Sequence, residues 1–80
     1  MADPIISTQI IRYLESIRIA EGMSLPDFVG YFDMSMMSYW RWRRAADQDA
    51  VINIKLSTLE NGLKELGYDA RIIIAKAEKE

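Results

Sequence analysis

Hydrophobic positions in the first third of the chain repeat with the spacing of an amphipathic helix. Ile10, Leu14 and Ile17 recur at i, i+4 and i+7, which places them on one helical face. Ser7 or Thr8 offers the side-chain oxygen that commonly precedes a first helical turn. The pattern therefore predicts a helix that begins near these residues, with an earlier start at Asp3-Pro4 as the alternative, and that supports the segment that follows. Gly22 is expected to end it, since glycine readily adopts the conformation that closes a helix.

Residues 24–44 predict two short helices joined by a tight turn. Ser24 is expected to cap the first helix, and Asp27 to return a hydrogen bond as in a capping box. The expected apolar face of this helix is Phe28, Val29 and Phe32. Asp33 follows where the chain must turn, and aspartate tolerates a left-handed backbone better than most residues other than glycine.

The second of these helices shows two unlike faces. Ser35 is expected to cap it, while Tyr39 and Trp42, three residues apart, form its core face. The opposite face collects large and cationic side chains: Met36, Met37, Trp40, Arg41 and Arg44. Three arginines without an acid between residues 36 and 44 indicate a helix that contacts another molecule.

The second half of the chain predicts a polar loop over residues 45–50, then apolar residues covering the core, then another helix. A turn near Val51 would raise the number of helices from four to five. Ser57 and Glu60 have capping-box spacing. The apolar stripe of this helix is Leu59, Leu63 and Leu66, and Gly67 is expected to end it. Gly62 in its middle suggests a close approach to another helix.

The last apolar segment, residues 71–77, is short and rich in β-branched residues, which predicts a strand. An unpaired strand edge invites a partner, and a two-fold copy of the same chain is the simplest one. We expect residues 70–77 to mediate dimerisation. The residues expected at this interface are Arg71, Ile72, Ile73, Ile74 and Ala75. The alternative is a tail helix that packs back on the core.

Residues 24–44 resemble the helix-turn-helix of λ-repressor/Cro-like (XRE-type) DNA-binding proteins. The similarity rests on the following residues, which fit the family pattern without a gap: Met23, Ser24, Leu25, Phe28, Val29, Phe32, Asp33, Met34, Ser35, Tyr39, Trp40 and Trp42. Three positions depart from it, because Leu25 stands for a glutamine, Val29 for a small alanine and Asp33 for the turn glycine. In relatives the arginine at the position of Arg18 pairs with an acid; Asp27 is the candidate here, and a solvated Arg18 is the alternative.

The resemblance implies a mainly α, four- to five-helix, λ-repressor-like domain over residues 1–80, with the C-terminal strand used for dimerisation. Its second helix would enter the major groove of double-stranded DNA. The positions that match base-contacting sites are Met36, Met37 and Arg41. The candidates for contacts to the DNA backbone are Ser24, Ser35, Ser38, Trp40, Arg43 and Arg44. For Met36, Met37 and Trp40 the alternative is an apolar patch that binds a protein.

Charge is unevenly distributed along the 80 residues. The net charge is −2, yet residues 36–44 carry three basic and no acidic groups, against two and five in residues 1–35 and five and seven in residues 45–80. A local positive field can steer DNA whatever the total charge. The lack of cysteine and histidine excludes disulfides and a Cys/His zinc site. No apolar run approaches a membrane span and no signal peptide is evident, so a cytoplasmic protein without cofactor or metal is expected.

No catalytic constellation emerges, since a Ser–His pair is impossible without histidine and no glycine-rich phosphate loop is present. We therefore expect a dimeric, sequence-specific repressor that binds a (pseudo)palindromic operator and occludes a promoter. The tail also resembles that of small regulators such as HigA-type antitoxins, so an antitoxin that represses its own operon and binds a toxin is one alternative. The other is a protein-binding inhibitor built on a helix-turn-helix scaffold.

Overall fold

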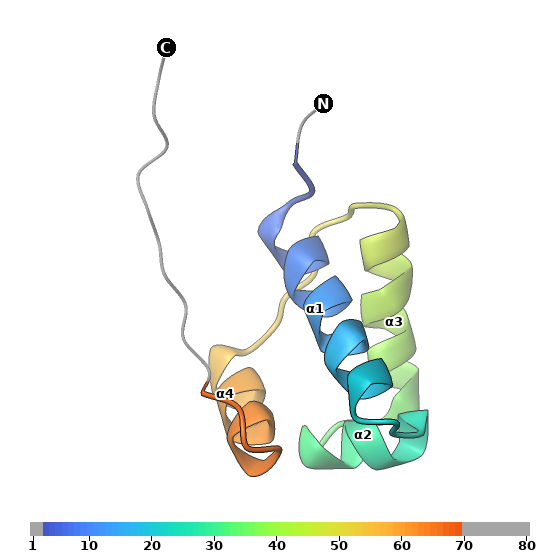
Figure 1. Cartoon of the computed structure of the whole chain (residues 1–80). Helices are drawn as coiled ribbons and strands as arrows, with labels where there is room; N and C mark the ends of the chain where they lie inside the picture. The colour runs from blue at the N-terminus through green and yellow to red at the C-terminus, as the bar shows by residue number, and fades with distance from the viewer. Residues whose placement is uncertain (1–2, 70–80) are drawn as a thin grey trace.

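The computed structural model describes residues 3–69, which form four helices and no strand (Figure 1). The helices are α1 (Ile6–Ala20), α2 (Leu25–Tyr31), α3 (Met36–Asp47) and α4 (Leu56–Glu65). α1 packs along α3, and α2 contacts both α3 and α4. The described part of the chain is thus mainly helical, as expected, with four helices and not five. The strand expected over residues 70–77 lies outside the described residues. No helix among residues 3–69 is both long and apolar enough to span a bilayer.

Each of the four helices ends in the same backbone motif, with one residue in the left-handed conformation. These residues are Gly22, Asp33, Asp49 and Gly67, with φ of 65°, 49°, 50° and 90°. In each case the next N–H reaches back to a carbonyl of the last turn: Met23 to Arg18 at 3.0 Å, Met34 to Val29 at 3.3 Å, Ala50 to Ala45 at 2.8 Å and Tyr68 to Leu63 at 2.8 Å. This is the Schellman arrangement. It confirms the stops predicted at Gly22 and Gly67 and the turn at Asp33.

α2 and α3 start at the residues predicted from the sequence, whereas α1 and α4 start elsewhere. Ser24 and Ser35 cap α2 and α3 as predicted, but within residues 3–69 the Asp27 side chain returns no hydrogen bond to Ser24, so the predicted capping box is only half formed. α1 begins earlier than Ser7 or Thr8, after Ile5, and has no side-chain cap. Ser57 and Glu60 form no capping box, because α4 starts at Leu56 after Lys55 and Ser57 already lies inside the helix.

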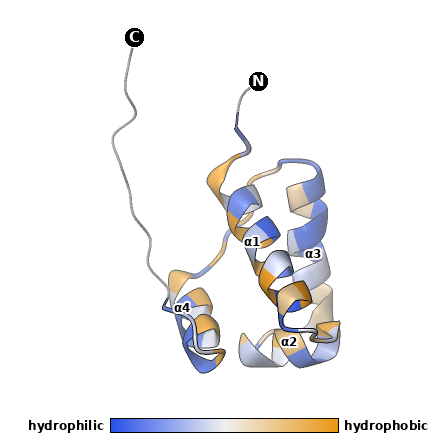
Figure 2. Cartoon of the chain, viewed as in Figure 1, coloured by the Kyte–Doolittle hydropathy of each residue, from blue (hydrophilic) through white to orange (hydrophobic). Residues whose placement is uncertain are grey.

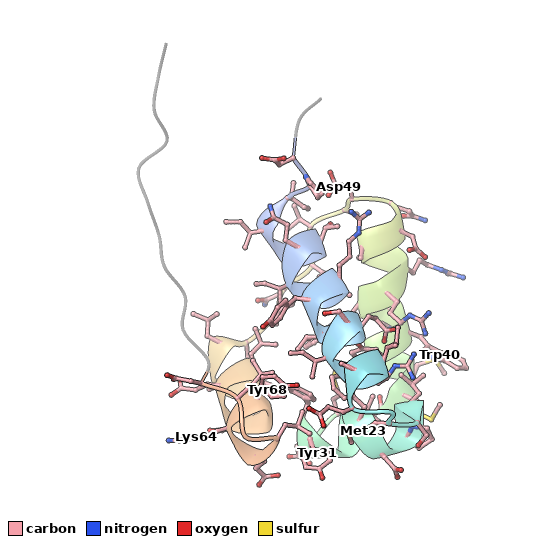
Figure 3. The ribbon with its side chains drawn as sticks, viewed as in Figure 1. Met23, Tyr31, Trp40, Asp49, Lys64 and Tyr68 are labelled. Atoms are coloured by element: carbon pink, nitrogen blue, oxygen red, sulfur yellow. The ribbon has the colours of Figure 1, made fainter. Side chains whose placement is uncertain are left out.

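The start of α1 is fixed by a contact from a distant part of the chain. The Ile5 N–H donates a 3.0 Å hydrogen bond to Asp49 Oδ1, which ties this end of α1 to the end of α3 (Figure 3). Asp49 therefore has two roles, since it also takes the left-handed conformation that ends α3. A tertiary hydrogen bond replaces the local cap that sequence pattern alone would supply.

The core is centred on aromatic side chains from α2 and α3. Phe28 contacts Phe32 at a ring-centroid distance of 5.0 Å and Tyr39 at 5.8 Å, and Tyr39 contacts Trp42 at 6.0 Å. The other buried apolar residues are Ile11, Leu14, Ile17, Val29, Ala46 and Leu59. The core faces predicted for α2, α3 and α4 are confirmed. On α1 the stripe is rotated slightly, because Ile11 is fully buried while Ile10 is only half-buried.

Gly62 is the place where α4 meets the end of α2. A Cβ built on Gly62 would stand 2.7 Å from Phe32 Cγ and closer still to two further ring atoms. Real Cβ atoms do not approach an aromatic ring so closely. The close approach that the sequence suggested at this glycine is confirmed, and Phe32 is the side chain that requires it.

A polar cluster of Glu15, Arg18 and Tyr39 joins α1 to α3. The Tyr39 hydroxyl donates a 2.9 Å hydrogen bond to Glu15 Oε1. Arg18 donates to both oxygens of the same carboxylate at 3.2 Å, and its remaining nitrogen donates to the Met23 carbonyl at 3.0 Å. The prediction that Arg18 pairs with Asp27 is wrong, because Glu15, one turn earlier on the same helix, is within reach of the guanidinium.

The cluster lowers the pKa of Glu15. Its burial acts in the opposite direction, but hydrogen bonds from Arg18 and Tyr39 and the positive charges of Arg18 and Arg43 stabilise the ionised carboxylate more strongly. Burial and the bond to Glu15 raise the pKa of Tyr39, so its hydroxyl stays protonated and able to donate. Glu15 is thus an anion at neutral pH, held between two helices.

We predict that Gly62→Ala destabilises the protein by about 1–3 kcal/mol, because the new methyl group overpacks the interface with Phe32. Gly30→Ala is the matched control, since this glycine also lies in a helix and a Cβ there has no neighbour within 4 Å. That control should be neutral or slightly stabilising, because alanine favours helix. Urea unfolding of both variants measures the difference. Equal stability of the two variants would contradict the close packing at Gly62.

We predict that Glu15→Gln lowers the free energy of unfolding by about 1–2 kcal/mol at pH 7 and by clearly less at pH 3. The folded-state pKa of Glu15 is lowered, so its stabilising effect is complete above the ordinary pKa and is lost as pH falls through the lowered one. Urea titrations at several pH values test this. Glu60→Gln, at an exposed site on α4, is the control. If the difference in free energy of unfolding between wild type and Glu15→Gln does not decrease as the pH falls, the prediction is wrong.

Candidate nucleic-acid interface

The outer face of α3 consists of Met37, Trp40, Arg41 and Arg44, all of which are exposed. The side chains of Met37 and Trp40 are among the most accessible large apolar groups in residues 3–69, at 63% and 53%. Trp40 lies on the side of α3 turned away from α1 (Figure 3). An open hollow on this side is lined by Met37, Trp40, Arg41, Arg43, Arg44 and Asp47.

The rotation of α3 about its axis is set by the residues on its other side. Tyr39 is fully buried and Trp42 nearly so, and the hydrogen bond from Tyr39 to Glu15 fixes this face against α1. Ser35 fixes the first turn, because its Oγ accepts the Ser38 N–H at 3.1 Å. With one face held in this way, residues on the opposite side of the helix must project outward. The exposure of the outer face therefore follows from the core.

Met36 lies apart from the outer face with which the sequence pattern grouped it. It is half-buried and packs against the core cluster. The reason is helical geometry, since Met36 lies one turn before the buried Tyr39 and so shares its side of the helix. Of the three predicted base-contacting residues, only Met37 and Arg41 are exposed together.

The three arginines of α3 have different surroundings. Arg43 points toward α1, where its Nε lies 4.0 Å from Glu15 Oε2. Within residues 3–69, Arg41 and Arg44 form no ion pair. Their charges are therefore available to a ligand, whereas the charge of Arg43 is shared with Glu15.

Asp47 was expected in a polar loop, but it is the last residue of α3 and lines the hollow beside the arginines. Sequence reasoning overlooked it because the helix runs past Arg44 to include Ala45 and Ala46. Alanine is the strongest helix former, so these two residues were the signal in the sequence for a predicted helix that continues past Arg44. Asp47 places one negative charge at the far end of an otherwise cationic face.

The three predicted backbone-contacting serines all lie at helix starts. Ser24 and Ser35 are exposed N-caps. Ser38 is half-buried, and its hydroxyl accepts a 3.0 Å hydrogen bond from Ser35. These hydroxyls stabilise the first turns of α2 and α3, and those of Ser24 and Ser35 remain at the surface beside the exposed N–H groups there.

The second half of α3 is strongly hydrophilic, while the start of α1 and the start of α4 are apolar (Figure 2). The positive charge of the outer face stands against a net charge of −2 for the whole chain. Such a face attracts polyanions locally, and acids elsewhere oppose binding through other faces. Among residues 3–69 no group of three potential ligands could hold a metal ion. The predicted dimerisation residues, 71–75, lie outside the described part of the chain.

Comparisons of this chain with protein-family models, with curated proteins and with solved structures give no match. The similarity of residues 24–44 to XRE-type proteins is therefore one of residue pattern alone. What α3 binds has to be inferred from its own side chains.

Proposed function

We propose that this protein is a small, sequence-specific DNA-binding repressor that acts as a homodimer by occluding a promoter. The observation that carries the proposal is the outer face of α3, a helix capped by Ser35, where two exposed apolar side chains are followed by two arginines that form no ion pair within residues 3–69. A helix of this kind fits the major groove of double-stranded DNA, with its first turns toward the bases and its later arginines toward the phosphates.

In this proposal Met37 and Arg41 contact base edges. Arginine makes a bidentate contact with guanine O6 and N7, and methionine offers apolar contact to a thymine methyl group. Ser24, Ser35, Ser38, Arg43 and Arg44 contact phosphates, and Trp40 packs on the sugar–phosphate backbone. Met36 then supports α3 from the core side, and Arg43 contributes less than Arg44 because Glu15 shares its charge.

The proposed dimer forms through residues 71–75 about a two-fold axis. Such a dimer requires a (pseudo)palindromic operator, because its two recognition helices are related by the same symmetry. If both helices enter successive major grooves on one side of the DNA, the half-site centres are about 34–36 Å apart.

A second candidate function is favoured by the exposure of Met37 and Trp40. Readers of base sequence commonly use more polar side chains, whereas protein interfaces are enriched in methionine, aromatic residues and arginine. In this alternative the outer face of α3 binds a protein, either a toxin or the target of an inhibitor. Binding that depends little on salt, and selection of no DNA sequence, would favour this candidate.

We predict that Arg44→Ala weakens binding to specific and nonspecific DNA about equally, because it removes a phosphate contact. The slope of log Kd against log salt concentration should fall in magnitude by about 1. Binding titrations at several salt concentrations measure the slope. Lys64→Ala on α4 is the control, since it removes the same charge from an exposed site that lies across the molecule from Trp40 (Figure 3). Equal slopes for wild type and Arg44→Ala would place Arg44 away from DNA.

We predict that Arg41→Ala reduces affinity mainly for the cognate operator and relaxes the preference at one base pair in each half-site. A bidentate contact to guanine contributes about 1–3 kcal/mol of discrimination. The measurement is a binding selection from a randomised DNA pool with wild type and variant. The two affected base pairs should be related by the operator dyad. If the wild-type protein selects no sequence, or if Arg41→Ala retains the full preference, the base-reading role of Arg41 is wrong.

A further inference from the structure

An apolar groove lies on the side of the molecule formed by the start of α1, the connection between α3 and α4, and the start of α4. Its lining residues are Ile5, Ile6, Ser7, Ile10, Val51, Ile52, Asn53, Ile54 and Leu56. Three of them are strongly exposed, with relative accessibilities of 75% for Ile6, 86% for Val51 and 60% for Leu56. The proposed DNA interface does not use this groove, which is separate from the outer face of α3.

One wall of the groove has the character of a strand edge. Residues 51–55 are in no helix, and their exposure alternates, with Ile52 and Ile54 half-buried against the core and the residues between them exposed. Within residues 3–69 the N–H groups of residues 51–55 donate no hydrogen bond. A row of this kind, with alternating side chains and free donors, is a template for strand addition.

We propose that residues 71–75 of the same chain lie against residues 51–55 as an added strand and cover the groove. The sequence Arg-Ile-Ile-Ile-Ala combines high β-propensity with apolar side chains that can cover the apolar lining of the groove. Pairing along one edge satisfies the donors of alternate residues among 51–55, since successive N–H groups of a strand point to opposite edges, and it buries Val51 and Leu56. The segment is a better occupant than a separate protein, because it is always present at high effective concentration.

The length of the chain permits this placement. The Tyr68 N–H is hydrogen bonded to the Leu63 carbonyl, so after α4 ends at Glu65 the chain turns back to the level of Leu63, seven residues beyond Leu56. Seven helical residues span about 10 Å, and an extended chain covers about 3.3–3.6 Å per residue. Three or four residues after Tyr68 therefore reach the start of α4, where the groove begins. Residues from Arg71 onward arrive at its edge.

The same geometry sets the strand direction. The segment arrives at the Leu56 end and runs toward Val51, so it is antiparallel to residues 51–55, which run into α4. A strand has two edges, and the second edge of residues 71–75 stays available for the two-fold copy in the proposed dimer. The inference is independent of DNA binding, because neither the groove nor the segment belongs to the outer face of α3.

The test uses the full-length chain, which contains no cysteine, so engineered disulfides form without competition. Asn53→Cys, at an exposed site, is combined in turn with Ile72→Cys, Ile73→Cys or Ile74→Cys. We expect one of these pairs to oxidise rapidly within a single chain, even at the lowest protein concentration that can be assayed, because cross-strand Cβ atoms lie about 4.5–5.5 Å apart. The matched control is Asn53→Cys with Lys79→Cys, which should oxidise at least about tenfold more slowly.

Hydrogen exchange provides the second measurement. The alternate amides among residues 51–55 that face the added strand should exchange about tenfold faster in Ile73→Asp than in wild type, while the amides of α1 and α3 exchange at unchanged rates. Lys79→Asp, the control, should leave the exchange rates of all these amides as they are in wild type. Disulfides found only between chains would overturn docking within one chain and place the segment in the groove of a second copy. If none of the three pairs with residues 72–74 oxidises faster than the pair with residue 79, or if no amide among residues 51–55 is protected in wild type, the proposed strand is overturned.

Discussion

The hydrogen bond from Tyr39 to Glu15 is the contact on which the geometry of the exposed surface depends. Tyr39 is wholly buried in the aromatic core, and its hydroxyl must still find an acceptor, because an unpaired buried hydroxyl costs about 1–3 kcal/mol. Glu15 supplies that acceptor from α1, and Arg18 neutralises the carboxylate while bonding to the Met23 carbonyl. One cluster thereby fixes the rotation of α3 and the path of the chain into α2.

From that fixed rotation the surface chemistry of α3 follows. Residues near Tyr39 on the helical wheel, such as Met36, turn inward, while Met37, Trp40 and Arg41 turn outward. The Arg43 side chain reaches the edge of α1 and shares Glu15. The same carboxylate that positions the helix thus divides its arginines into one held by the protein and two that remain available.

Much of this arrangement could be predicted from local sequence. The caps at Ser24 and Ser35, the left-handed residues Gly22 and Asp33, and the apolar faces of the helices all depend on neighbours within one turn. What could not be predicted depends on contacts between distant residues. Ile5 is held by Asp49, forty-four residues away, and so α1 starts without a local cap. The partner of Arg18, by contrast, was within reach of local reasoning, because Glu15 lies three residues earlier on α1 while Asp27 lies nine residues later. At the candidate interface the sequence pattern grouped Met36 with Met37, although its spacing of three residues from Tyr39 already favoured the core side of the helix.

The two apolar surfaces of the protein differ in a way that bears on their uses. On α3, Met37 and Trp40 lie next to cationic side chains. Such a mixed surface can stay exposed to water without aggregating, so it suits a ligand that binds reversibly. The groove at residues 51–56 is lined by isoleucine, valine and leucine, with Ser7 and Asn53 as its polar members. Burying such a surface is favourable by roughly 25 cal/mol for each Å² removed from water, so permanent cover is expected there. In the proposed arrangement the three consecutive isoleucines at residues 72–74 supply that cover from the same chain. Cover from within the chain would also prevent the free edge from pairing with unrelated strands, which is the common hazard of an exposed edge.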